Sequence, residues 1–321
     1  MRTHWSDRQE YSDHKFRLDC NETIDTYFAE VIRDFLTTLT PDDVTHYPDI
    51  KSAYKCLSKI TDVPTDQLYI VPGSEQGIKS ILHLQQSDTI NINTPTFKLT
   101  EVYSELYRYD IKINRFDYDG EFGLGQERVN GGVYIANPDN PTGYTYSELD
   151  VDNMCQCADF VILDLVYENH IDHNILDLVN KHDNLYIVKS FSKMGGAAGL
   201  RVGYVCSNKH NINKLYDWRP MFEINSIACK YLAYISEHVD ELILSDYRIK
   251  YGKQMLQEHL SKKYHVVTCG GNFVIVEHDE KLACKLDKLC YYRTLDICDK
   301  KFIRITASSP DITKYIIDEI L

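Results

Sequence analysis

The chain has 321 residues, 43% of them hydrophobic, so it can form one large core or a large domain with a smaller companion. Its formal net charge of −13 argues against nucleic acid as a partner, although a local basic pocket can still hold a small anion. No apolar run approaches the roughly 20 residues that span a bilayer, and the N-terminus lacks the apolar segment of a signal peptide. We therefore expect a soluble cytoplasmic protein that does not bind membranes.

The 10 cysteines are scattered and include no CxxC pair, which argues against a zinc site or a redox motif. We expect reduced thiols packed as small apolar side chains. The stretch HIDH at residues 170–173 carries two histidines, but no strong third metal ligand stands nearby. We interpret it as a solvated loop and expect no metal site.

Apolar runs alternate with helical patterns between residues 67 and 207. Helices are predicted at 74–84 and 95–107 from the spacing of their apolar residues. Strands are predicted at 67–73, 88–92, 132–138, 159–164, 184–190 and 201–207. Strands this apolar, interleaved with helices, are typical of a mainly parallel sheet that helices cover on both faces.

The pattern changes after Asp217, where a long helical region extends to Lys263. Strands at 264–268, 272–278 and 302–306, a helix at 281–291 and a final helix complete the chain. Fewer strands and longer helices predict a smaller α+β domain, which the first 35 residues would join. We predict a large domain at 36–217 and a small domain made of 1–35 and 218–321.

Polar residues follow four of the predicted strands, where the functional sites of open α/β sheets lie. Ser74 and Glu75 begin a helix directly after the first strand, and the free N–H groups of a helix start favour an anion. A plain helix cap, with Ser74 as the N-cap residue, explains this segment equally well.

The other three strand ends supply an amide, an acid with a phenol, and an amine. Asn140 lies in the segment NPDNPTG, and Asp164 ends a strand three residues before Tyr167. Lys193 follows an apolar strand and the two serines of SFSK, and Arg201 comes eight residues later. Any single acid of this kind is more often a cap or half of an ion pair.

Together these groups suit a phosphorylated aromatic aldehyde cofactor. The amine would form a Schiff base, the acid would keep the pyridine nitrogen protonated, and the amide and phenol would bond the ring hydroxyl. The helix start, the hydroxyls and the guanidinium would hold the phosphate.

At this point the chain resembles a known family over nearly its whole length. The segments NPDNPTG and SFSK-x7-R, with the pair Asp164 and Tyr167, are similar to fold-type I pyridoxal-phosphate (PLP) enzymes. The resemblance is strongest to the histidinol-phosphate aminotransferase group of the class I/II aminotransferases. Further segments in the family order are RLDCNET, HYPD, PGSEQGI, PTF, GGNFVIV and FIRIT.

The resemblance implies a role for each matching residue around the cofactor. Lys193 would bind PLP and move the α-proton, Asp164 would pair with the pyridine nitrogen, and Asn140 and Tyr167 would bond the ring hydroxyl. Phe97 occupies the position of the aromatic residue that stacks on the ring. The phosphate would be held by the backbone of Ser74 and Glu75 and by Ser190, Ser192 and Arg201.

The resemblance also implies a partner subunit and a substrate site. Tyr47 matches the tyrosine that reaches the phosphate of the neighbouring subunit, so a homodimer with shared active sites is implied. Arg304 matches the arginine that takes the carboxylate of an amino-acid substrate, Arg293 is a second possible anion contact, and Asn21 lies in the segment that covers the substrate.

The chain departs from the family pattern in several places. Leu165 and Val166 replace the usual Glu-Ala between Asp164 and Tyr167, and Thr23-Ile24 replaces Asn-Pro. Phe97 lacks the hydroxyl of the common tyrosine. These changes leave the PLP assignment in place and weaken histidinol phosphate as the substrate.

Three hypotheses follow. The leading one is an aminotransferase that passes an amino group from an amino acid to a keto acceptor. The second is a decarboxylase of the threonine-phosphate decarboxylase type, which would use the same cofactor residues. The third is a non-catalytic protein on the same fold, which would be expected to lack Lys193 or Asp164, and both are present.

Overall fold

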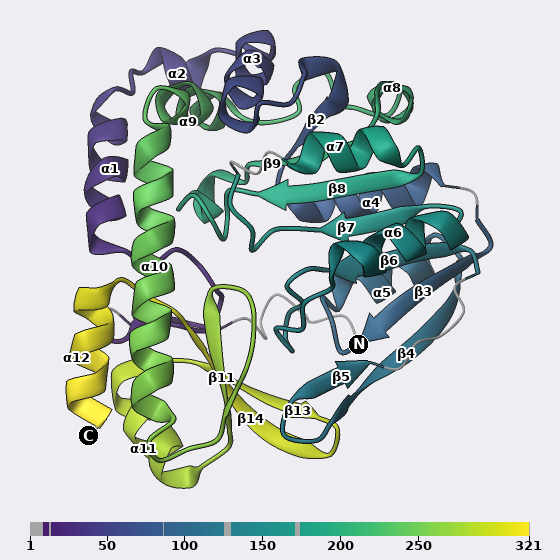
Figure 1. Ribbon diagram of the computed structural model, residues 1–321. Coiled ribbons are helices and arrows are strands. Elements are labelled where there is room, and N and C mark those ends of the chain that lie inside the picture. Colours follow the sequence, from purple (N-terminus) through teal and green to yellow (C-terminus); the bar gives the residue numbers. More distant parts are fainter. Residues whose placement is uncertain (1–8, 13, 86, 125–129, 171–173, 321) are drawn as a thin grey trace.

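The structure is a computed structural model that describes residues 9–12, 14–85, 87–124, 130–170 and 174–320. An eight-stranded sheet in the order β2-β9-β8-β7-β6-β3-β4-β5 forms its larger part (Figure 1). Neighbours from β8 to β4 pair in parallel, and β9 and β5 run antiparallel to theirs. The strands are β2 (Leu68–Val71), β3 (Thr89–Thr94), β4 (Asp110–Tyr118), β5 (Phe122–Leu124), β6 (Gly132–Ala136), β7 (Val161–Asp164), β8 (Leu185–Ser190) and β9 (Gly203–Cys206).

Helices cover both faces of this sheet, as predicted, because the side chains of each buried strand alternate between two cores. In β8, Ile187 packs into one core and Val188 into the other. One face meets α4 (Ser74–Leu84), α5 (Leu99–Leu106) and α8 (Lys209–Tyr216). The other meets α3 (Ile50–Thr61), α6 (Glu148–Cys157), α7 (Asn174–Lys181) and α9 (Ser226–Ser236).

A four-stranded antiparallel sheet in the order β10-β11-β14-β13 forms the smaller part. Its strands are β10 (Val266–Val267), β11 (Phe273–Glu277), β13 (Arg293–Ile297) and β14 (Lys300–Thr306). The short strands β1 (Phe16–Arg17) and β12 (Cys290–Tyr291) pair in parallel beside it. Helices α11 (Glu280–Leu289) and α12 (Pro310–Ile320) pack with it, so an α+β unit is present as predicted.

The long helix α10 (Val239–Leu260) runs alongside both parts, next to α1 (Thr26–Thr37) and α12 (Figure 1). The remaining helical segments are α2 (Asp42–Thr45), η2 (Thr65–Gln67) and η3 (Ala198–Leu200). No helix within the described part of the chain is long and apolar enough to cross a membrane.

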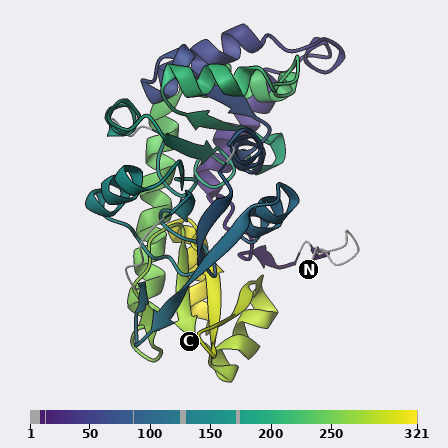
Figure 2. The ribbon, with the colours of Figure 1, turned by 90° about the vertical axis from the view of Figure 1, so that its right-hand side faces the viewer.

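The β4–β5 hairpin reaches from the large sheet to the small one (Figure 2). The Tyr118 hydroxyl donates to Glu277 at 2.8 Å, and the rings of Tyr118 and Phe302 lie 5.0 Å apart. The Cys298 thiol donates to the carbonyl of Phe116 at 3.1 Å. These contacts join the two sheets directly, in addition to the helix α10 that runs alongside both parts.

Two local expectations were wrong. The helical region after Asp217 is not continuous, because α9 ends at Ser236 and α10 begins at Val239. The helix expected at 95–107 begins only at Leu99, since Pro95 to Phe97 form a turn after β3. The division of the chain into two domains at residue 217 stays a prediction.

Candidate active site

The carboxyl ends of β2, β6, β7 and β8 meet around one cavity of about 210 Å³. Parallel strands bring their carboxyl ends to the same edge of a sheet, so residues far apart in sequence become neighbours. Ten of the fourteen predicted site residues line this cavity. They are Ser74, Glu75, Phe97, Asn140, Asp164, Tyr167, Ser190, Ser192, Lys193 and Arg201, and they are joined by Tyr134, Ala136 and Val166.

The start of α4 forms one wall. The N-cap residue is Gly73, with φ +86° and no side-chain cap, so the alternative with Ser74 as N-cap is wrong. The first N–H groups of such a helix have no partner within the helix and favour an anion. Gly203 of β9 lies against this turn, where a Cβ would stand 2.6 Å from the nitrogen of Ser74.

Three further side chains gather beside this helix start. The Arg201 guanidinium donates to the Ser192 hydroxyl at 3.3 Å, and the backbone N–H of Ser192 donates to the Ser190 hydroxyl at 3.1 Å. A Cβ at Gly73 would collide with the Arg201 guanidinium. Because Gly73 has no side chain, the Arg201 guanidinium can lie beside the N–H groups at the start of α4. A cation beside such N–H groups suits a phosphate.

Asp164 ends β7 and is 4% exposed. Its carboxylate accepts hydrogen bonds from the Tyr134 hydroxyl at 3.0 Å and from the backbone N–H of Val166 at 3.2 Å. Burial raises the pKa of Asp164 to about 6, and these hydrogen bonds and the charge of Lys193 oppose that rise. Such a carboxylate gains stability from a cationic or N–H partner in the cavity.

Lys193 follows β8 and is turned toward the N-terminal segment, where its amine donates to the carbonyl of Cys20. Burial lowers the pKa of the Lys193 amine, and the nearby Arg304 and Arg201 guanidinium groups lower it further. A lowered pKa increases the fraction of unprotonated amine, which is the nucleophilic and basic form.

Asn140 and Tyr167 are each bound to a residue from the smaller part of the molecule or from the N-terminal segment. The Arg304 guanidinium donates to the side-chain oxygen of Asn140. The Asn21 amide donates to the Tyr167 hydroxyl at 3.0 Å, and Asn21 is itself held on β14 by Thr306. The predicted substrate residues Asn21 and Arg304 thus lie directly behind two cavity residues.

Arg293 and Arg304 stand directly opposite each other on β13 and β14. Opposite residues of an antiparallel pair lie on the same face of the sheet, which fixes the register of Arg293. Arg304 is almost fully buried and also donates to the carbonyl of Asp19 at 2.7 Å. Arg293 is half exposed and forms an ion pair of 3.4 Å with the buried carboxylate of Asp19.

Tyr47 lies outside the cavity. Its side chain is 81% exposed and its ring stacks flat on Phe222 with the centroids 4.4 Å apart. Met221, which precedes Phe222 in the sequence, is 85% exposed, and Val44, three residues before Tyr47, is 74% exposed. No contact within the described residues connects Tyr47 to Lys193.

The expected solvated loop at 170–173 is wrong for its first residue, and residues 171–173 lie outside the described residues. His170 is buried and its ring stacks on Phe191 with the centroids 3.8 Å apart. Its two ring nitrogens lie 3.2 Å from the Tyr204 hydroxyl and 2.6 Å from the carbonyl of Met194. Burial lowers the pKa of His170 to about 3, so it stays neutral.

Sequence reasoning missed three residues of the cavity. Tyr134 and Ala136 are hidden in the apolar run of β6, and Val166 stands between Asp164 and Tyr167. Strand alternation gave a usable signal, because Ala136 pairs with Asp164 and Tyr134 lies two residues earlier on the same face.

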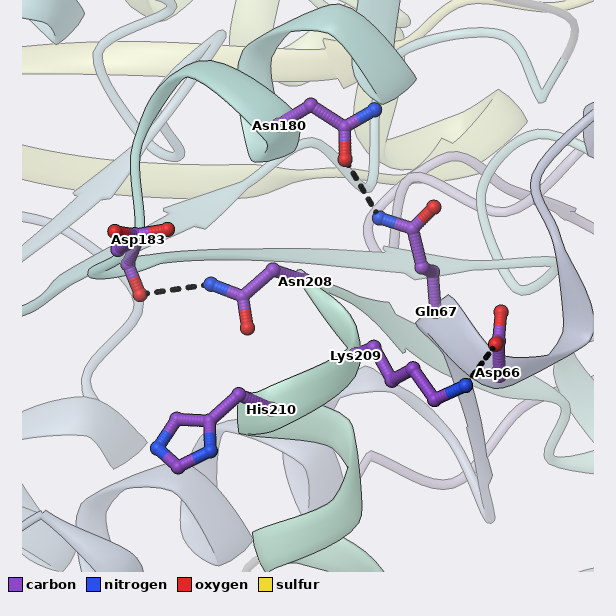
Figure 3. A pocket seen from close by; sticks show the side chains of 7 residues that line it. All are labelled: Asp66, Gln67, Asn180, Asp183, Asn208, Lys209 and His210. Carbon is purple, nitrogen blue, oxygen red and sulfur yellow. Dashed lines mark hydrogen bonds and ion pairs between the residues drawn. The ribbon is translucent and has the colours of Figure 1, made fainter.

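A second, more open pocket lies near the opposite, amino ends of the strands (Figure 3). Most of its polar side chains bind their neighbours. Gln67 donates to Asn180 at 2.9 Å, Lys209 pairs with Asp66 at 3.0 Å, and Asn208 donates to a backbone carbonyl at 3.0 Å. This pocket holds no residue of the predicted site.

The residues around the first cavity fit PLP by their chemistry. A buried carboxylate of raised pKa, an amine of lowered pKa and a glycine-lined helix start with a guanidinium stand at one place. The aromatic ring of Phe97 lines the same cavity. Few ligands other than a phosphorylated pyridine aldehyde would use all four kinds of group.

The sequence and the fold were compared with known proteins. The family model of aminotransferase class I and II matches residues 14–320. A histidinol-phosphate aminotransferase of Clostridium novyi is 25% identical over 327 residues, covering 92% of this chain and 88% of that protein.

Two solved structures have a similar fold. The histidinol-phosphate aminotransferase of Sinorhizobium meliloti in complex with pyridoxal-5'-phosphate has a TM-score of 0.75 at 17% identity, covering 95% of this chain and 90% of that one. The L-threonine-O-3-phosphate decarboxylase of Porphyromonas gingivalis has a TM-score of 0.75 at 17% identity, covering 95% and 98%. At these identities the structures establish the fold.

Proposed function

Because the chain belongs to the class I and II aminotransferases and is a PLP-dependent enzyme of fold type I, we propose that the cavity at the strand ends is its active site. The observation that carries this proposal is the meeting of Lys193, Asp164 and the start of α4 around one cavity. In this proposal Lys193 binds the cofactor covalently, and the same amine later moves the α-proton of the substrate.

The remaining cavity residues hold the cofactor. Asp164 would pair with the pyridine nitrogen, Asn140 and Tyr167 would bond the ring hydroxyl, and Phe97 would cover one face of the ring. The phosphate would be bound by the Arg201 guanidinium. The backbone N–H groups of Ser74 and Glu75 and the hydroxyls of Ser190 and Ser192 would also donate hydrogen bonds to it.

When bound, PLP supplies a carbonyl carbon that reacts with amines and a pyridinium ring that accepts the electrons of a broken bond at Cα. The protein residues control which protons move. Asp164 in its ionised form would keep the ring nitrogen protonated, and Tyr134 and Val166 hold the carboxylate in place by their hydrogen bonds. The free amine of Lys193 would take the proton from the substrate Cα and hold it for return, which is the proton transfer that transamination requires.

The substrate in this proposal is an amino acid whose carboxylate binds Arg304. The relatives named histidinol-phosphate aminotransferase make a phosphorylated amine such as histidinol phosphate a candidate, with Arg293 as the second anion contact. The ion pair between Arg293 and Asp19 already offsets one of the two positive charges. A substrate with a single anionic group therefore fits the pair of arginines at least as well as a phosphate.

We also infer a homodimer with shared active sites. The exposed side chains of Val44, Tyr47 and Met221 and the stacking of Tyr47 on Phe222 support it, because large exposed apolar side chains are typical of subunit contacts. In the dimer Tyr47 would reach the phosphate in the neighbouring subunit. The 10 cysteines are free thiols, which suits a reducing compartment, and we propose the cytoplasm.

The test is a panel of amino acids and phosphorylated amines added to the PLP-loaded protein, with keto-acid formation measured beside release of labelled CO₂. Transamination predicts conversion of the cofactor from its aldehyde to its amine form without CO₂, with one keto acid formed from an amino acid or one ketone formed from a phosphorylated amine such as histidinol phosphate. Labelled CO₂ without keto acid would instead favour the decarboxylase. Lys193→Ala is expected to lose the visible absorbance of the covalently bound cofactor, and a wild type that takes up no PLP would refute the proposal.

A further inference from the structure

A partly buried lysine of α10, Lys253, holds a loop of the smaller part in place. The Lys253 amine donates hydrogen bonds to the carbonyl oxygens of Cys269, Gly270 and Gly271 at 2.6, 3.1 and 2.9 Å. A lysine ammonium has three N–H donors, so these three carbonyls use all of them. Burial lowers the pKa of Lys253.

This loop packs against the turn that carries Asn140. The backbone N–H of Gly270 donates to the carbonyl of Gly143 at 2.7 Å. A Cβ at Gly143 would collide with Cys269, and a Cβ at Gly270 would collide with Pro138. The two backbones are therefore in direct contact, and a shift of the loop would displace the turn.

The same loop supports Tyr167 by two routes. The Asn272 amide donates to the carbonyl of Asn21 at 3.0 Å, and the Asn21 amide donates to the Tyr167 hydroxyl at 3.0 Å. The ring of Phe273 also packs edge to face on Tyr167, with the centroids 5.5 Å apart. Asn140 and Tyr167 thus both rest on the segment that directly follows Cys269.

We propose that Lys253 is a positioning residue for the reaction: by anchoring residues 269–271 it sets the positions of Asn140 and Tyr167 in the cavity. The inference rests on the proposed function in one respect, namely that these two residues bond the ring hydroxyl of PLP. Without the amine, three partly buried carbonyls lose their donor, and the loop is expected to move so that they reach water or other donors. A displacement of about 1 Å that originates far from the reacting atoms can lower the rate roughly a hundredfold.

The experiment compares Lys253→Met, Lys253→Arg and the control Lys262→Met, which makes the same change at an exposed lysine just beyond α10. The first readout is hydrogen exchange at the Gly270 amide in PLP-free protein. We expect exchange at least tenfold faster in Lys253→Met and unchanged in Lys262→Met. Lys253→Arg keeps a charged donor, so it is expected to recover most of the protection.

The second readout is the pH midpoint of the visible absorbance of the PLP-loaded protein, measured with kcat and KM. Lys253→Met is expected to move this midpoint in the same direction as Asn140→Ala, and to lower kcat by roughly tenfold to a hundredfold. Unchanged exchange at Gly270, or an unchanged midpoint beside a shifted one in Asn140→Ala, would overturn the inference. An unchanged midpoint in Asn140→Ala itself would instead refute the role assigned to Asn140.

If Lys253→Met does not fold, Lys253→Gln replaces it and the same outcomes apply. The glutamine keeps two N–H donors on a shorter side chain, so it can satisfy at most two of the three carbonyls. We expect its Gly270 exchange to be faster than in the wild type and its midpoint to lie between those of the wild type and Asn140→Ala, and wild-type values for both would overturn the inference.

Discussion

Gly203→Ala provides the sharpest test of the phosphate site, because the added methyl group would meet backbone atoms that cannot rotate away. Its Cβ would stand 2.6 Å from the nitrogen of Ser74 and 2.7 Å from the carbonyl carbon of Gly73. Ordinary van der Waals contact begins at 3.4 Å, so the first turn of α4 would have to retreat by about 0.8 Å. Gly203 pairs with both β2 and β8, which prevents the strand from yielding instead.

The size of the effect follows from this displacement. Overpacking of a buried site typically costs about 1–3 kcal/mol of stability. Losing one charge-assisted hydrogen bond to the phosphate costs about 1.5–3 kcal/mol, which corresponds to roughly tenfold to a hundredfold weaker PLP binding.

The assay is an absorbance titration with PLP together with thermal unfolding of the PLP-free protein. The control is Gly199→Ala, since a Cβ at Gly199 meets no atom within 4 Å. We expect Gly203→Ala to melt at a lower temperature and to bind PLP at least tenfold more weakly, and Gly199→Ala to match the wild type. Wild-type PLP affinity in a destabilised Gly203→Ala would refute the assignment of the phosphate to this helix start.

Three further substitutions test two groups of the site and the buried Asp139 next to Asn140. Asp164→Ala should still bind PLP but lose roughly a thousandfold in kcat, because the pyridine nitrogen is no longer kept protonated; a wild-type rate would contradict its role. Arg201→Ala should raise the Kd for PLP by about tenfold or more while kcat at saturating PLP changes less, and an unchanged Kd would argue against a phosphate contact. Asp139 is buried with its pKa raised from 3.8 to about 7, so the folded PLP-free chain keeps a proton that the unfolded chain loses. The resulting stability is complete below about pH 4 and is lost as the pH rises through 7, by up to about 4 kcal/mol. The urea midpoint of the wild type, measured relative to that of Asp139→Asn, should therefore decrease as the pH is raised from 4 to 7. A difference in midpoint that does not depend on pH would refute the raised pKa of Asp139.

Much of the cavity could be predicted because its residues follow apolar strands. Asp164 ends such a strand, Asn140 and Lys193 come a few residues after one, and parallel pairing brings their positions together whatever the details of packing. The strands themselves were predictable because both of their faces are buried. By contrast, no strand is predicted at β4, since most of its nine residues are exposed or partly exposed and charged residues recur along it.

The contacts behind the cavity could not be predicted in this way. The bond from Arg304 to Asn140 and the bond from Asn21 to Tyr167 join segments more than 140 residues apart. No local pattern determines which side chain of one sheet meets which strand end of the other. These contacts depend on how the smaller sheet packs on the larger one.

The register of Arg293 is an intermediate case, because a local feature determines it after all. The turn between β13 and β14 consists of Cys298 and Asp299, and both residues have positive φ, at 52° and 58°. A two-residue turn of this kind pairs Ile297 with Lys300, and every later pair follows by counting outward until Arg293 stands opposite Arg304. Such turns usually carry Asn-Gly or Asp-Gly, and the unusual Cys-Asp concealed this one. The two arginines therefore share one face of the sheet because of a two-residue turn, and lengthening that turn by one residue should move Arg293 to the other face.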